Sequence, residues 1–197
     1  MNKNHYIVKT IFTREECNEI LKMKTKMVRR QELMPEFDQK KSTFINNNFR
    51  PNTPITEDSS GEHMDKIIEA DSWVYDRLME NNDIGNFATC DGGLWPLLLK
   101  EYQDGDEVGM HFDDARGIRR VAASISLNDD YEGGVFQFPV WKFDFETGKD
   151  NFKIVDVKLK VGQMVQFPLI LLHRIAPITK GVRKQLVTWY TGEVLNW

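Results

Sequence analysis

The chain contains only two cysteines, Cys17 and Cys90, in 197 residues. Two cysteines are too few for the disulfide framework of a small secreted domain, so we expect a reducing, cytoplasmic location. The first ten residues lack the long apolar core of a signal peptide, and no apolar run approaches the length that crosses a membrane. The formal net charge of −4 gives no overall attraction to nucleic acid or anionic membranes. We therefore expect neither nucleic acid nor membrane as a partner.

The length of the chain favours a single domain that can bury a core of its own. We expect residues 1–197 to form one domain, in which residues 1–85 are mostly helical support and residues 86–197 form a β-rich core. Thr13 and Glu16 fit a capping box, with threonine at the N-cap and glutamate at N3. This pair predicts the start of a helix.

Three further patterns lie in the N-terminal part. The basic run 22–30 is interpreted as the solvated face of that helix, because flanking acidic residues make a nucleic-acid patch the poorer interpretation. The polar segment 34–60 is longer than an ordinary connection, and we expect it to form a lid that clamps the substrate. Residues 62–81 carry apolar side chains at helical spacing and predict a helix with a buried stripe.

From about residue 87 the sequence changes to short apolar stretches separated by turn residues. A series of strands after a block of helices predicts an α+β fold, a jelly roll with the N-terminal helices packed on one sheet. The insertion 141–151 fits no part of this pattern and is either a second substrate-facing loop or only a hairpin. The expected strands include 94–102, 121–127, 153–160, 164–167, 169–175 and 185–190.

The segment YQDGDEVGMHFD, residues 102–113, ends in a candidate metal-binding pair. Side chains two residues apart on an extended backbone point to the same side, so His111 and Asp113 share a face while Phe112 turns away to pack. An imidazole and a carboxylate on one face are two of the three ligands in the facial triad that holds non-haem Fe(II). The rest of the chain must supply the third ligand.

The third ligand must come from the remaining histidines of the four in the chain. His5 lies at the N-terminus and His63 at an expected helix start, so both are poor candidates. His173 lies late in the apolar strand LILLHRI. A single histidine on an apolar strand is more often a core residue than a ligand, and that alternative stays open here. The role of a metal ligand is favoured for His173, because a sheet-lined cavity already offers His111 and Asp113.

A cation is also needed if the iron binds a 2-oxo acid through its open positions. Arg183 follows His173 by ten residues across a turn, so a hairpin would return it to the strand of His173. Its planar guanidinium suits a carboxylate in bidentate geometry. Lys184 has the opposite parity and should point outward. The residues expected on the inward face are Arg183, Gln185, Val187 and Trp189.

Together these residues resemble the prolyl 4-hydroxylase-like family of Fe(II)/2-oxoglutarate dioxygenases. The resemblance covers roughly residues 95–191, and the N-terminal stretch TIFTREECNEI also resembles the first helix of that family. The order and spacing of the motifs are more specific than any one of them. They are Tyr102, His111-x-Asp113, Leu127-Asn128, Gly133-Gly134, Gly162, His173, Gly181-x-Arg183 and Trp189.

The resemblance implies a double-stranded β-helix (jelly-roll) core and a set of site residues. Arg183 would bind the distal carboxylate of 2-oxoglutarate, and Tyr102 would line the cosubstrate pocket. Ser126 stands where many relatives have a second tyrosine, which leaves the carboxylate contacts partly open. The implied iron ligands are His111, Asp113 and His173, and the implied cosubstrate-binding residues are Arg183, Tyr102, Ser126 and Trp189.

The implied reaction is hydroxylation of an unactivated C–H bond, coupled to oxidation of 2-oxoglutarate to succinate and CO₂. The carboxylate at Asp113 favours hydroxylation, because halogenating relatives lack it. No catalytic residue is expected beyond the iron ligands. The implied cofactors are Fe(II), 2-oxoglutarate as cosubstrate and O₂, with ascorbate as an optional addition.

The substrate implied first is a prolyl residue in a peptide or protein. The alternatives are a free amino acid or other small molecule, and a non-oxidative, metal-binding protein of the cupin kind. Nucleic-acid demethylation is less favoured, because those relatives carry a second arginine where this chain has Trp189. No oligomeric state is predicted.

Overall fold

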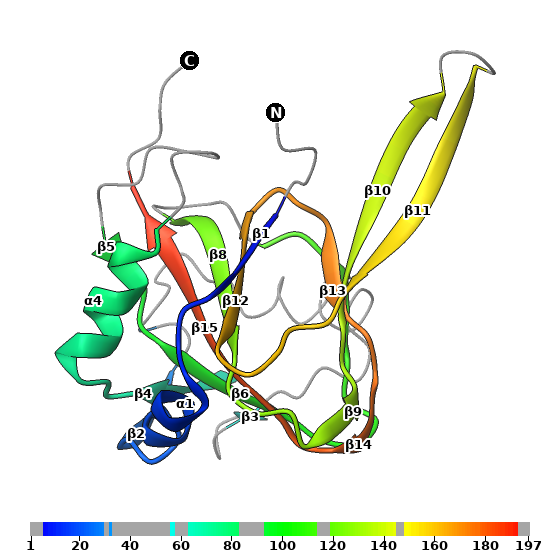
Figure 1. Cartoon of the computed structure of the whole chain (residues 1–197). Helices are drawn as coiled ribbons and strands as arrows, with labels where there is room; N and C mark the ends of the chain where they lie inside the picture. Colours follow the sequence, from blue (N-terminus) through cyan, green and yellow to red (C-terminus); the bar gives the residue numbers. More distant parts are fainter. Residues whose placement is uncertain are drawn as a thin grey trace.

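The computed structural model is mostly β-sheet with few helices (Figure 1). The helices in the described residues are α1 (Arg14–Ile20) and α4 (Ser72–Glu80), and neither is long and apolar enough to cross a membrane. The segment 34–60, where a lid is predicted, lies outside the described residues except for 56–57. The structure describes residues 6–29, 32, 56–57, 63–82, 93–113, 119–144 and 148–192, with only the backbone of 56–57, 63, 141–144 and 149–151.

The larger sheet has nine strands within the described residues, with the central order β1-β12-β8-β15-β6-β4-β2. N-terminal strands lie on both sides of the strands from the second half of the chain, because β1 pairs with β12 and β4 pairs with β6. Two short strands complete it, β3 beside β4 and β5 beside β15. The bounds are β1 (Ile7–Thr10), β2 (Thr25–Arg29), β3 (Thr56–Glu57), β4 (His63–Ile68), β5 (Gly93–Leu94), β6 (Leu98–Tyr102), β8 (Arg119–Ser126), β12 (Gln163–Pro168) and β15 (Arg183–Thr191).

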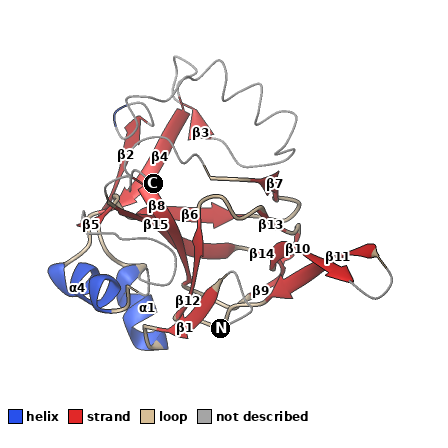
Figure 2. Cartoon of the chain, turned by 90° about the horizontal axis from the view of Figure 1, so that it is seen from above, coloured by secondary structure: helices blue, strands red, loops and turns tan. Residues whose placement is uncertain are grey.

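The smaller sheet has the order β11-β10-β13-β7, and a third sheet pairs β14 with β9. The hairpin of β10 and β11 projects from the body on the side away from the two helices (Figures 1 and 2). The described residues of the insertion, 141–144 and 148–151, belong to the outer part of this hairpin, one of the two expected forms. The bounds are β7 (Val108–His111), β9 (Tyr131–Gly133), β10 (Phe136–Asp144), β11 (Lys149–Val157), β13 (His173–Ile175) and β14 (Ile178–Gly181).

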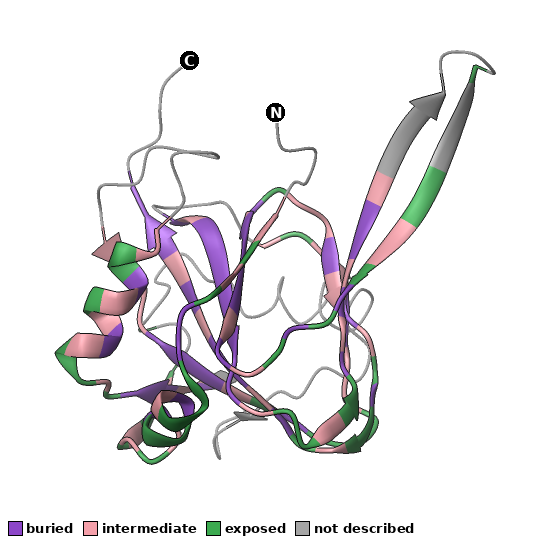
Figure 3. Cartoon of the chain, viewed as in Figure 1, coloured by how far each residue is buried: buried purple, intermediate pink, exposed green. Residues whose placement is uncertain are grey.

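Two hydrophobic cores lie on opposite faces of the larger sheet. On β8, Val121 and Ile125 belong to the core that also contains the buried residues of α1 and α4, whereas Ala122 belongs to the core shared with the smaller sheet. Buried residues are concentrated on the central strands, while the helices carry exposed residues on their outer side (Figure 3). Two sheets that enclose a common core are the arrangement of a jelly roll.

The start of α1 and one turn follow the predicted pattern. The Thr13 hydroxyl accepts a hydrogen bond from the Glu16 amide at 3.2 Å, and the Glu16 carboxylate accepts one from the Thr13 amide at 2.8 Å, which completes the capping box. Gly162 has a positive φ of +77°, and a Cβ there would lie 1.8 Å from the carbonyl oxygen of Phe12. This turn therefore requires glycine.

The predicted helices before residue 82 are partly wrong. Residues 63–68 form strand β4 rather than the first turns of a helix, and residues 25–29 of the basic run form strand β2. In β4, buried Asp65 and Ile67 alternate with half-buried Met64 and Lys66, which is the period of a strand. The described residues of 1–85 thus contain four strands beside two helices, because pairing with β6 extends the sheet.

Candidate metal and cosubstrate site

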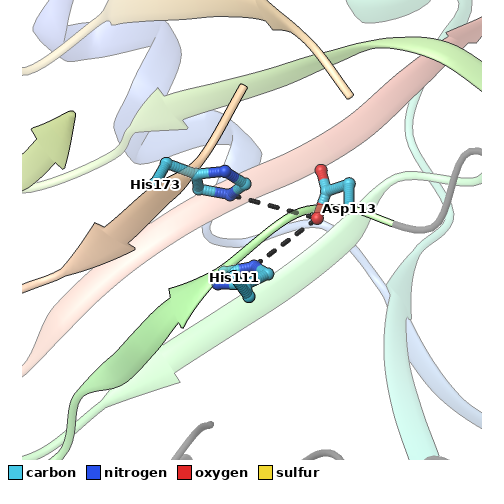
Figure 4. Close-up of side chains that lie close together, drawn as sticks. All are labelled: His111, Asp113 and His173. Atoms are coloured by element: carbon cyan, nitrogen blue, oxygen red, sulfur yellow. Dashed lines mark ion pairs between the residues drawn. The ribbon is translucent and has the colours of Figure 1, made fainter. Parts of the chain in front are cut away.

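His111, Asp113 and His173 lie together at the edge of the smaller sheet. His111 ends β7, and His173 begins β13 directly opposite it in the antiparallel register. Asp113 follows β7 and is held to the loop before β13 by its amide, which donates to the Leu169 carbonyl at 3.2 Å. The candidate ligand atoms of the three residues all lie within 4.8 Å of one another (Figure 4).

Both histidines are oriented in the same way. The Nδ1 atom of His111 lies 2.8 Å from the Gly109 carbonyl oxygen, and that of His173 lies 2.9 Å from the Leu171 carbonyl oxygen. A carbonyl oxygen can only accept, so Nδ1 carries the proton and the lone pair is on Nε2. Both Nε2 atoms face Asp113, whose Oδ1 lies 3.5 Å from that of His111 and 3.9 Å from that of His173.

Asp113 is a carboxylate with only 12% of its side chain exposed, and it stays ionised. Burial by itself would raise its pKa, but the two histidines, when protonated on Nε2 as well, outweigh burial through a hydrogen bond from His111 and their positive charges, and hold the pKa below its ordinary value. The neutral histidines instead present their Nε2 lone pairs to a metal ion. The Trp189 indole adds a further hydrogen bond, from Nε1 to Oδ2 at 2.9 Å. The site therefore offers two imidazole nitrogens and one anionic oxygen.

Arg183 is a buried cation, and two of its three nitrogens lack hydrogen-bond partners among the described residues. The residue is 1% exposed, and among the described residues its Nε and Nη1 have no hydrogen-bond acceptor. Its guanidinium carbon lies 5.1 Å from the centre of the Phe136 ring and 5.7 Å from that of Tyr102. Burying a guanidinium without an acceptor is costly, so this position is suited to an anion.

Arg183 and the metal-binding group border the same cluster of aromatic rings. The Phe136 ring lies 6.2 Å from the Phe167 ring, and Phe167 in turn lies 4.5 Å from the ring of His173. The predicted alternation of β15 is confirmed, since Leu186 packs into the core beneath the helices and Trp189 packs against the other core.

Asn128 and Gly134 both belong to the motif set and position Arg183, although no role was predicted for either. The Asn128 side chain donates to the Val182 carbonyl at 2.7 Å and accepts from the Lys184 amide at 2.7 Å, so it holds the backbone on both sides of Arg183. A Cβ on Gly134 would lie 2.9 Å from Cδ of Arg183. Glycine at this position therefore leaves the space through which the arginine side chain passes.

A buried hydrogen-bond chain that the sequence did not indicate holds the Tyr102 hydroxyl. Ser124 Oγ donates to Gln185 Oε1 at 3.0 Å, and Gln185 Nε2 donates to Tyr102 Oη at 3.2 Å. Ser126 lies on the same face of β8 as Ser124, and its hydroxyl donates to the Asn128 carbonyl at 3.1 Å. The sequence did predict that Gln185 faces inward, from its strand parity, but not that it links Ser124 to Tyr102.

Three other predicted positions differ or fall outside the site. Phe112 was expected to turn away and pack, but it is 58% exposed. Strand β7 ends at His111, so Phe112 lies just beyond the paired part of the strand. His63 lies in strand β4 rather than at a helix start, and His5 lies outside the described residues.

Comparisons with known proteins cover the same part of the chain. Residues 97–191 match the family model of the 2OG-Fe(II) oxygenase superfamily. A PKHD-type hydroxylase from Methylobacillus flagellatus is 34% identical over 107 residues, which are 49% of this chain and 43% of that protein. A PKHD-type hydroxylase from Thermosynechococcus vestitus is 37% identical over 105 residues, 49% of this chain and 42% of that protein. The chain thus matches a little under half the length of these curated relatives.

Two solved structures share the fold. The viral collagen prolyl hydroxylase of Paramecium bursaria Chlorella virus-1, in complex with 2OG, has a TM-score of 0.55 and 17% identity, covering 98% of both chains. The prolyl hydroxylase of Trichoplax adhaerens, in complex with a peptide fragment of the hypoxia inducible factor oxygen degradation domain, has a TM-score of 0.58 and 16% identity. That match covers 96% of this chain and 84% of the other.

Proposed function

We propose that this chain, whose residues 97–191 match the family model of the 2OG-Fe(II) oxygenase superfamily, is a 2-oxoglutarate-dependent dioxygenase that hydroxylates a C–H bond. We further propose a prolyl residue of a peptide or protein as its substrate. Membership of the superfamily implies Fe(II), 2-oxoglutarate and O₂. The observation that carries the proposal is a complete metal donor set and, across the same aromatic cluster, a buried guanidinium whose Nε and Nη1 have no acceptor among the described residues.

The residues present fit both groups. Two imidazole nitrogens and one carboxylate oxygen are the donor set of the Fe(II) facial triad, so His111, Asp113 and His173 would hold the metal. The Nε and Nη1 groups of Arg183, which have no acceptor among the described residues, leave its guanidinium available to a carboxylate. Bound Fe(II) supplies the activation of O₂ that oxidises 2-oxoglutarate to succinate and CO₂ while the substrate C–H becomes C–OH.

The chain itself binds, orients and excludes water. Arg183 would take the distal carboxylate of 2-oxoglutarate, and the rings of Phe136 and Tyr102 beside it keep that ion pair out of water and so strengthen it. The Tyr102 hydroxyl, held by Gln185, would contribute a second contact to the cosubstrate. Ser126 and Trp189 complete the proposed cosubstrate residues.

Residues 1–197 are proposed to be one domain. The support is that β1 to β4 join the same sheet as β6, β8, β12 and β15, so no boundary separates the N-terminal part from the site. The buried residues of α1 and α4 lie in one core with those of β8 and β15, which supports helical packing on the outer face of that sheet.

A polypeptide substrate is supported by exposed apolar side chains beside the metal-binding group. Phe112 is 58% exposed between His111 and Asp113, and Ile170, next to the carbonyl that holds Asp113, is 75% exposed. Apolar side chains at a site can bind the residues that flank a target in a longer chain. Relatives named as hydroxylases, and a neighbour in complex with a peptide, point the same way.

The test is turnover by the Fe(II)-reconstituted protein with 2-oxoglutarate and, in parallel reactions, a peptide library or a mixture of free amino acids. We expect succinate, and by mass spectrometry a gain of one oxygen on proline-containing peptides. The His173→Ala variant serves as the matched control and should give neither product. Oxygen gain only on free amino acids would replace the peptide substrate with a small molecule. Metal binding without any succinate would favour a non-oxidative, cupin-like protein.

A further inference from the structure

The two oxygens of Asp113 have different surroundings. Oδ1 faces the Nε2 atoms of both histidines, at 3.5 and 3.9 Å, and Figure 4 shows both ion pairs meeting on this one atom. Oδ2 accepts the indole N–H of Trp189 at 2.9 Å. The indole therefore fixes the rotation of the carboxylate and decides which oxygen is directed at the histidines.

The Trp189 indole packs against the Arg119 guanidinium, which also packs against Trp95. The guanidinium carbon of Arg119 lies 4.9 Å from the centre of the Trp189 ring and 5.5 Å from that of Trp95. Arg119 is only 4% exposed, so its guanidinium is shielded from water, whereas Trp95 and Trp189 are half-buried. The backbone fixes the two tryptophans together, since the Trp95 amide donates to the Trp189 carbonyl at 2.8 Å. A guanidinium stacked on an indole in a dry setting is a strong cation–π contact.

A local irregularity in the sheet brings Arg119 to this position. On the β8–β15 pair, Tyr190 lies opposite Val121 and Thr191 lies opposite Arg119, so Arg120 is one extra residue on β8. A β-bulge shifts the alternation of side chains beyond it. Without the bulge, Arg119 would share the face of Val121 under the helices; with it, the side chain reaches Trp189 on the inner face.

We propose that Trp189 is a positioning residue, held by Arg119, that keeps Asp113 a ligand through one oxygen only. This inference rests on the metal site in the proposed function. A carboxylate whose second oxygen accepts an indole N–H offers the metal a single donor atom. The positions that a second carboxylate oxygen would occupy then stay available for 2-oxoglutarate and O₂. Hydrogen-bond partners of ligating side chains commonly change metal affinity or activity by roughly 10–100-fold.

The experiment is a titration of the full chain with Co(II) alone, without cosubstrate, followed by the d–d absorption bands. Trp189→Phe keeps an aromatic ring for Arg119 but removes the N–H donor. We expect about tenfold weaker Co(II) binding. We also expect changed d–d bands, because these bands respond to the number of ligand atoms. Arg119→Met should change both readouts in the same direction but less.

The matched control is Trp73→Phe, which removes an indole of α4. This indole packs edge-on against Phe12 in the core beneath the helices, on the opposite face of the larger sheet from Trp189. The control variant should bind Co(II) as the wild type does, and thermal melts should show that all variants are folded. Wild-type affinity and an unchanged spectrum in folded Trp189→Phe would overturn the inference and leave the metal site standing. A wild-type chain that binds Co(II) no better than Asp113→Ala would instead remove the metal site, and this inference with it.

Discussion

Replacing Arg183 with methionine removes a buried charge while keeping much of the side-chain volume. Arg183 is 1% exposed and lies between two aromatic rings, so a carboxylate bound there forms a desolvated ion pair. Truncating one partner of such a pair costs about 2–5 kcal/mol. At about 1.4 kcal/mol per factor of ten, this cost corresponds to a loss of roughly 30-fold to several thousand-fold in affinity for 2-oxoglutarate.

The same substitution should have the opposite effect on the stability of the protein without cosubstrate. Two guanidinium N–H donors lack acceptors among the described residues, and that desolvation cost disappears with methionine. Replacing buried charges with apolar side chains of similar volume is often neutral or stabilising by about 1–4 kcal/mol. In a chain of this size each 1 kcal/mol raises the melting temperature by about 2–4 °C. A structural arginine with internal partners would instead destabilise the protein when removed.

The assay is an anaerobic titration of the Fe(II) protein with 2-oxoglutarate, followed by the metal-to-cosubstrate charge-transfer band, with melts in parallel. Arg183→Lys should be intermediate, since it keeps the charge but loses the planar fork. Lys184→Met is the matched control, because its side chain lies on the opposite face of β15. Wild-type affinity in Arg183→Met would refute the cosubstrate assignment. A loss in Lys184→Met alone would place the required cation on the other face.

Three further predictions follow from the site and the core. Asp113→Ala and His173→Ala should each abolish succinate formation while far-UV circular dichroism stays native, because two remaining ligands hold a divalent ion poorly; turnover in either variant would remove that residue from the metal site. Asn128→Ala should lower both 2-oxoglutarate affinity and stability, the latter by about 1–3 kcal/mol measured by urea unfolding, since two backbone groups beside the buried arginine lose their partner. Burial raises the pKa of the Cys17 thiol to about 11, so in a Cys90→Ser background a thiol reagent at pH 8 should react only after unfolding, and fast labelling of the native protein would contradict this burial.

The parts of the site that could be predicted depend on local backbone geometry. Alternation across a strand is fixed by the chain itself, so the shared face of His111 and Asp113, and the opposite faces of Arg183 and Lys184, follow from spacing alone. The position of His173 does not follow from spacing alone, because it requires a strand that returns beside β7. Strand β13 is that strand, and its antiparallel register places His173 opposite His111.

The elements that were predicted wrongly depend on partners far away in the sequence. Residues 63–68 carry apolar side chains at spacings that fit a helix or a strand, and the choice is made by pairing with β6 on one side and β2 on the other. Phe112 has the right parity to turn away from the metal-binding group, but parity does not say whether another segment covers it.

The supports around the site were beyond the sequence for a related reason. Arg119 has the parity of Val121 and would be assigned to the outer face, and only the extra residue in the bulge moves it to Trp189. A bulge is a property of two paired strands, so it is not written in either strand by itself. The same holds for Asn128, whose amide contacts the backbone on both sides of Arg183 from 54 residues away. Ligand positions therefore follow from local spacing, whereas the groups that orient those ligands follow from the pairing of distant strands.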